Sequence, residues 1–78
     1  MKLVEARADR LLSIRELARK AGIEWKTVYN VEKGLTTPSM TTMRKLAEAL
    51  EINPKEIDEF RAAIEKTIRG KETTPASE

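Results

Sequence analysis

The sequence is marked first by what it lacks, since its 78 residues include no cysteine and no histidine. Without thiols no disulfide can form, and without thiols or imidazoles the usual zinc clusters are excluded. The commonest catalytic nucleophiles and general bases are missing for the same reason, and there is no glycine-rich phosphate-binding loop. We therefore expect a protein with no enzyme activity, no metal and no cofactor.

Long hydrophobic runs are missing too. The first ten residues, MKLVEARADR, are charged throughout and contain no apolar segment of the kind that a signal peptide needs. No stretch approaches the roughly 20 apolar residues of a membrane span. The length suits a single domain with a small core. These features predict a one-domain cytoplasmic protein that does not associate with membranes.

Charge is distributed unevenly along the chain. Residues 1–45 carry ten Lys and Arg against five Asp and Glu, a net charge of +5, whereas residues 46–78 carry five against eight, a net charge of −3. A basic first half favours contact with a polyanion. The alternative is that these charges form an ordinary solvated surface.

Helical periodicity runs along nearly the whole chain, and no alternating strand pattern interrupts it. Residues suited to cap a helix N-terminus precede three of the helices: Ser13, Ser39 and Asn53. Gly22 and Gly34 are suited to end a helix. The predicted helices cover residues 2–10, 14–21, 24–33, 40–50 and 54–69. Residues 70–78 lack large apolar side chains and are predicted to be a disordered tail, so the domain is expected to span residues 1–69.

Residues 14–34, IRELARKAGIEWKTVYNVEKG, predict two helices joined by a sharp turn. The small Ala18 permits close helix packing, and Gly22 permits the turn. At about 100° per residue, Val28 and Val31 fall on the side that faces the core. The opposite side of the second of these helices carries Trp25, Lys26, Tyr29, Asn30 and Lys33.

This segment resembles the DNA-binding domain of the Cro/C1-type (Xre-like) helix-turn-helix family of phage and bacterial repressors. The family pattern runs roughly L-S-Q-x-x-L-A-x-x-x-G-V-S-x-x-x-I-S-x-x-E-x-G and continues into a loop with P-S. The matching residues include Leu12, Ser13, Leu17, Ala18, Gly22, Glu32, Gly34, Pro38 and Ser39. The resemblance covers residues 1 to about 60. It implies an all-α, compact, five-helix lambda-repressor-like fold with the helix-turn-helix at the second and third helices and an extended fifth helix.

The resemblance also implies double-stranded DNA as the partner, since the third helix of the related repressors enters the major groove. The implied base contacts are Trp25, Lys26, Tyr29 and Asn30. The implied phosphate contacts are Arg15, Arg19, Thr27, Lys33, Thr36, Thr37 and Arg44. Lys26 could donate to guanine and Asn30 could pair with adenine. The predicted function is that of a sequence-specific transcriptional regulator, in the simplest case a repressor; the alternative for these side chains is plain surface or, for Trp25, a place at the edge of the core.

Two positions depart from the family pattern. Ile14 stands where a glutamine often contacts phosphate or base, and Glu24 stands where Ser or Thr often caps the third helix. A glutamate favours a helix N-terminus but repels DNA phosphates. Both changes favour an alternative in which Trp25 and Tyr29 bind a protein partner, as in an antitoxin-type regulator or a protein-interaction module.

Arg7 and Glu32 stand at positions that form an ion pair in similar repressors, between the first helix and the E-x-G glutamate. The resemblance therefore implies a structural ion pair here. Removing one partner of such a buried pair costs about 3–5 kcal/mol. The alternative is a looser surface pair worth under about 1 kcal/mol.

The fifth predicted helix is longer than this fold needs. Phe60, Ile64 and Ile68 extend an apolar stripe along it, and an exposed stripe of this kind indicates an interface. We expect a homodimer that uses these three residues and places two reading helices about 34 Å apart on DNA. The alternative is that this helix folds back on the first helix and frays at its end.

Overall fold

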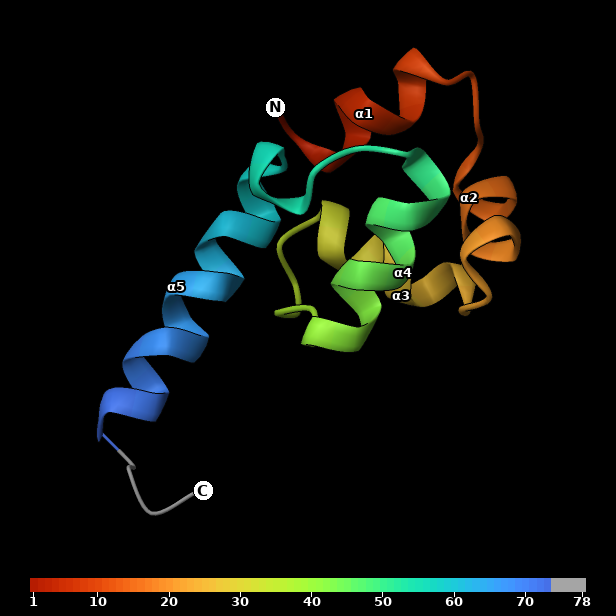
Figure 1. Ribbon diagram of the computed structural model, residues 1–78. Coiled ribbons are helices and arrows are strands. Elements are labelled where there is room, and N and C mark those ends of the chain that lie inside the picture. Colours follow the sequence, from red (N-terminus) through yellow and green to blue (C-terminus); the bar gives the residue numbers. More distant parts are fainter. Residues whose placement is uncertain (74–78) are drawn as a thin grey trace.

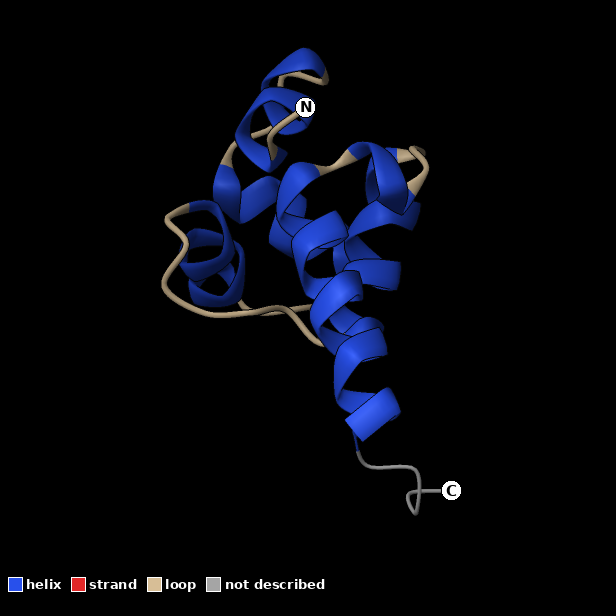
Figure 2. Ribbon diagram, turned by 90° about the vertical axis from the view of Figure 1, so that its left-hand side faces the viewer, coloured by secondary structure: helices blue, strands red, loops and turns tan. Residues whose placement is uncertain are grey.

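The computed structural model describes residues 1–73 of the chain, with side chains as far as Ile68. This part contains five α-helices, one short 3₁₀-helix and no strand, so the predicted all-α fold with five helices is confirmed. The elements are α1 (Leu3–Asp9), α2 (Ile14–Ala21), α3 (Trp25–Glu32), α4 (Met40–Leu50), η1 (Pro54–Glu56) and α5 (Asp58–Thr73). None of these helices combines the length and the apolar character that crossing a membrane requires. Figures 1 and 2 show α1 to α4 gathered into one body from which the far half of α5 projects.

Ser13 and Gly22 determine where α2 begins and ends. The Ser13 hydroxyl accepts a hydrogen bond from the Glu16 backbone N–H at 3.1 Å, and the Glu16 carboxylate accepts one from the Ser13 N–H at 2.8 Å. This confirms the predicted capping box. Gly22 is left-handed, with φ of 75°, and the Ile23 N–H donates to the Ala18 carbonyl at 2.9 Å. A Cβ on Gly22 would meet nothing within 4 Å, so backbone conformation and not crowding calls for glycine there.

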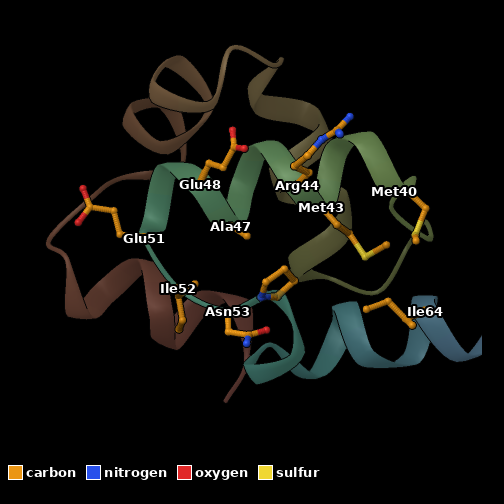
Figure 3. A pocket seen from close by; sticks show the side chains of 10 residues that line it. Met40, Met43, Arg44, Ala47, Glu48, Glu51, Ile52, Asn53 and Ile64 are labelled. Carbon is orange, nitrogen blue, oxygen red and sulfur yellow. The ribbon is translucent and has the colours of Figure 1, made fainter.

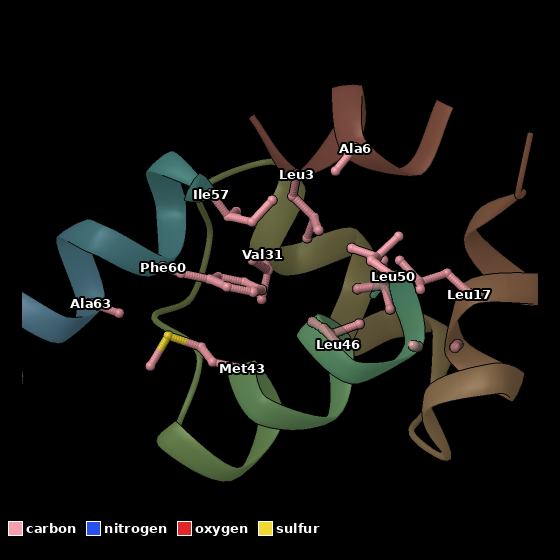
Figure 4. Close-up of a cluster of buried hydrophobic side chains, with 13 residues drawn as sticks. Leu3, Ala6, Leu17, Val31, Met43, Leu46, Leu50, Ile57, Phe60 and Ala63 are labelled. Atoms are coloured by element: carbon pink, nitrogen blue, oxygen red, sulfur yellow. The ribbon is translucent and has the colours of Figure 1, made fainter. Parts of the chain in front are cut away.

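The core draws on every α-helix. Leu3, Leu17, Val28, Leu46 and Phe60 are fully buried, and Figure 4 shows the side chains from α1 and α5 meeting those from the other helices. Val28 and Val31 face inward, as predicted. Burial of one apolar stripe per helix is therefore what holds the short helices together.

Phe60 is wrongly predicted as a dimer contact. It heads the fully buried side chains when these are ranked by volume, and it lies inside the main core cluster. The first turns of α5 pack on the body, so the stripe changes character along the helix. Ile64 is half-buried against the core, and Ile68 is 52% exposed. Of the three residues in the predicted stripe, only Ile68 at its far end has a largely exposed side chain.

The fifth helix does not begin at Pro54 as predicted. Asn53 caps a single 3₁₀ turn, η1, by accepting a hydrogen bond from the Lys55 N–H at 2.9 Å. Ile57 is then extended, with φ of −96° and ψ of 121°, and its side chain is fully buried. The helix therefore starts at Asp58, and the extended Ile57 before it places its side chain in the core.

The start of α5 is bonded to the start of the chain. The Asp58 N–H donates to the Met1 carbonyl at 2.7 Å, and the Leu3 N–H donates to the Glu59 carboxylate at 2.9 Å. Glu59 thus satisfies a backbone donor in the first turn of α1, which has no partner within its own helix. These bonds fix the direction in which α5 leaves the body.

The far end of α5 also differs from the prediction. The helix passes Gly70, where it was expected to stop, and continues to Thr73. Glycine permits a left-handed helix end but does not force one. The remaining residues of the predicted tail, 74–78, lie outside the described part of the chain.

Candidate nucleic-acid interface

An open hollow lies on the surface where α2 meets the first turn of α3. Its polar and aromatic lining consists of Arg15, Arg19, Glu24, Trp25 and Lys26. Three cations predicted to touch DNA are therefore neighbours, although they come from two helices. Glu24 is the N-cap residue of α3 but makes no side-chain capping bond, so its carboxylate stands among these cations without a backbone donor.

Two aromatic rings continue from this hollow along the outside of α3. Trp25 is 37% exposed and Tyr29 is 39% exposed, and their centroids lie 6.3 Å apart in an edge-to-face arrangement at 71°. The Arg15 guanidinium carbon lies 4.9 Å from the Trp25 ring centroid, and the Lys33 ammonium lies 5.7 Å from that of Tyr29. Both distances fall within cation–π range. These four side chains form a cation–aromatic row with a positive charge at each end.

Behind this face, Arg7 of α1 holds α3 in position. Its Nε donates to Glu32 Oε2 at 2.6 Å and its Nη2 donates to Oε1 at 3.1 Å. A third donor, Nη1, reaches the Leu12 carbonyl at 2.9 Å. The Glu32 side chain is only 5% exposed. Its hydrogen bond and charge raise the pKa of Arg7 against the opposing effect of burial, so the guanidinium remains charged at any physiological pH.

Comparison with known families agrees with this geometry. The family model described as the Cro/C1-type HTH DNA-binding domain matches residues 2–63, which take in α1 to α4 and the buried part of α5. The chain belongs to that family. The resemblance seen in the sequence is thereby confirmed. Cro/C1-type domains are DNA-binding regulatory domains and not enzymes. No curated protein and no solved structure matches the chain significantly.

Several further candidate residues of this Cro/C1-type domain lie on α3 or close to it. Lys26 is exposed beside the cation–aromatic row, whereas Thr27 and Asn30 are half-buried. Arg19 is exposed one turn along α2 from Arg15. The structure thus places the predicted base contacts on or beside the outer face of one helix.

The loop after α3 gathers a second group. Thr36 and Thr37 are exposed in it, and the Thr37 hydroxyl accepts a hydrogen bond from the Lys66 ammonium of α5 at 3.4 Å. Sequence reasoning missed Lys66, because 29 residues separate it from Thr37 and no local pattern links them. The structure adds this cation to the phosphate-contact candidates of the Cro/C1-type domain.

Arg44 borders an apolar groove between α4 and α5. The groove has a volume of about 690 Å³. Its apolar lining consists of Met40, Met43, Ala47, Ile52, Pro54 and Ile64. Figure 3 shows Arg44, Glu48 and Glu51 on the α4 side, pointing away from its floor. The groove itself offers apolar side chains to a partner, and the Arg44 cation lies at its edge.

Proposed function

We propose that this Cro/C1-type domain is a sequence-specific transcriptional regulator, acting as a repressor, that reads double-stranded DNA with the outer face of α3 in the major groove. The observation that carries the proposal is the exposed aromatic and basic face of α3 on a helix-turn-helix. Helices of this motif present their first residues to base edges. The base-reading residues are Trp25, Lys26, Tyr29 and Asn30.

Phosphate contacts surround that face and supply affinity that does not depend on sequence. Arg15, Arg19 and Lys26 lie around the hollow or beside it, and Lys66 approaches the loop that carries Thr37. The phosphate-contact set consists of Arg15, Arg19, Thr27, Lys33, Thr36, Thr37 and Arg44, with Lys66 added. A cytoplasmic location fits this role.

A homodimer is part of the proposal. Ile64 lines the α4–α5 groove, Ile68 lies one turn further along α5 and is 52% exposed, and Met40 at the groove is 55% exposed. The groove and the projecting end of α5 therefore form one continuous surface. A two-fold dimer would bury this surface on both copies. Glu48 and Glu51 beside the groove are in no ion pair among the described residues. Arg61 is exposed on α5, so a second copy would bring opposite charge to these carboxylates.

The proposed function is tested by selection from a random duplex DNA pool at about 0.15 M salt. We expect enrichment of a two-fold-symmetric site whose half-sites lie one helical turn apart. Affinity for that site should fall steeply as salt rises, because counterions are released from the phosphates.

The alternative is a protein-interaction module or antitoxin-type regulator, and the exposure of Trp25 and Tyr29 favours it. Selection would then enrich no sequence, and only weak, salt-sensitive DNA retention would remain. That result would overturn the DNA-reading proposal and direct the search to protein partners of the Trp25 and Tyr29 face.

A further inference from the structure

Arg15 occupies an unusual place for a surface cation. Its guanidinium lies 4.9 Å from the centroid of the Trp25 ring, and that ring is itself in edge-to-face contact with Tyr29. Among the described side chains, Arg15 takes part in no ion pair. The Arg15 side chain is therefore held by an aromatic ring, and no carboxylate within the described part of the chain pairs with its hydrogen-bond donors.

The chemistry of the guanidinium makes this arrangement useful. Its five N–H donors lie in the plane of the group and form a rigid fork. The contact with the Trp25 ring occupies none of these donors with an oxygen acceptor, so the fork remains available. Guanine presents two acceptors, O6 and N7, in the major groove, and a bidentate arginine is the commonest specific contact to them.

The location of Arg15 beside the first turn of α3 favours a base contact over a phosphate contact. Trp25 is the first residue of α3, in the turn of a helix-turn-helix that meets base edges, so a guanidinium held on Trp25 lies beside that turn. In the first turn of α2, Ile14 packs on the core and Glu16 closes the capping box. Arg15 is the donor that this turn can direct to the DNA.

We propose that Arg15 contacts a base and not the phosphate assigned to it above. It donates to O6 and N7 of a guanine, and Trp25 is the positioning residue that holds it there. The inference rests on the proposed function, since it requires α3 in the major groove. It assigns Arg15 a role different from that of Arg19, which lies one turn away on the same helix and has no ring contact among the described residues.

The test uses the full chain and the operator obtained by selection. Each guanine of one half-site is replaced in turn by 7-deazaguanine, which lacks the N7 acceptor, and dissociation constants are measured for each duplex. For the unaltered protein, we expect one position at which the replacement weakens binding about 10-fold. For Arg15→Ala, the replacement at that position should have no further effect, because the contact is already absent.

Arg19→Ala is the matched control. It should weaken binding to all sequences alike, reduce the salt dependence by about one phosphate contact, and keep the 7-deazaguanine effect. Arg15→Lys keeps the charge but not the fork, so it should lose most of the effect. Trp25→Leu should diminish the effect at that guanine more than at any other position.

The chain has a single tryptophan, which supplies an independent readout. In the free protein, Arg15→Ala should change Trp25 emission, whereas Arg19→Ala should not. Equal weakening of all sequences by Arg15→Ala, with the 7-deazaguanine effect retained, would overturn the inference and leave Arg15 a phosphate contact. Failure to select any operator would instead overturn the proposed function itself. Thermal melts by circular dichroism identify variants that do not fold.

Discussion

Arg7 on α1 and Glu32 at the end of α3 form a two-pronged ion pair, with N–O distances of 2.6 and 3.1 Å. The same guanidinium bonds to the Leu12 carbonyl, just before the cap of α2. One side chain thus connects α1, the beginning of α2 and the end of α3. Because Glu32 is only 5% exposed, its charge depends on Arg7 for compensation.

Arg7→Met should lower the free energy of unfolding by about 3 kcal/mol, since it leaves a buried carboxylate without its partner. Urea denaturation at pH 7 measures this change. The double variant Arg7→Met with Glu32→Leu should regain at least half of the loss, because no buried charge remains. A double variant as unstable as the single one would show that packing by the arginine stem matters more than the charge.

Acid should weaken the cap of α2. The hydrogen bonds from Ser13, the backbone N–H first, lower the pKa of Glu16 below its ordinary value of 4.5. A carboxyl whose pKa is lower in the folded state contributes stability above about pH 4.5, and that contribution is lost as the pH falls through the lowered pKa. Glu16→Gln should therefore lose less stability than the unaltered protein between pH 7 and pH 3 in urea titrations. An unchanged pH dependence would contradict this assignment.

The ends of α2 and α4 allow a paired test of left-handed backbone. Gly22 has φ of 75° and Glu51 has φ of 56°, each at a helix C-cap. Gly22→Ala should cost about 1 kcal/mol by backbone strain, since no atom would touch the new Cβ. Glu51→Gly should stabilise the protein by about 0.5–1 kcal/mol for the converse reason. Melting temperatures that move in the same direction for both would contradict this explanation.

Most of the sequence preference should reside in Lys26 and Asn30. The double variant Lys26→Ala with Asn30→Ala should bind DNA but lose the original operator in selection, keeping at most the guanine assigned to Arg15, because Lys26 is exposed and Asn30 half-buried on α3 and neither belongs to the core cluster. Circular dichroism should match that of the unaltered protein. If the double variant enriches the original operator, α3 does not lie in the groove as proposed.

Self-association should depend on the exposed end of the α5 stripe. Ile68→Glu should weaken the homodimer, because it places a charge where the α4–α5 groove of a second copy offers apolar side chains. Leu11→Glu is the matched control, since Leu11 is 90% exposed in the turn after α1. Sedimentation equilibrium measures both. A protein that remains monomeric at high micromolar concentration would contradict the dimer proposal.

Local signals in the sequence predicted most of the fold. The Ser13 capping box and the Gly22 turn involve neighbours in the chain, so residue type and spacing sufficed to locate them. The inward positions of Val28 and Val31 followed from helical periodicity. The ion pair of Arg7 and Glu32 required the family resemblance, because nothing local joins residues 25 positions apart.

Tertiary packing decided what the sequence left open. Ile57 interrupts the predicted fifth helix, and its side chain is buried in the core. Phe60 is buried because it lies in the first turns of α5, which are the turns that pack on the body. Helical periodicity predicts that α5 carries an apolar stripe, but it does not predict where along the helix that stripe stops packing on the other helices. The contact of Arg15 with Trp25 depends on the angle between α2 and α3 and on two rotamers, neither of which a pattern of letters encodes.

The uneven packing of α5 has a consequence for hydrogen exchange. Amides near Phe60 and Ala63 lie under buried side chains and should exchange only when the whole domain opens. Amides around Ile68 belong to a turn that can unwind by itself, so they should exchange orders of magnitude faster in a monomer. If a higher protein concentration slows exchange around Ile68 but nowhere in α1, a second copy covers that turn. The first half of α5 would then stabilise the domain and the second half the dimer.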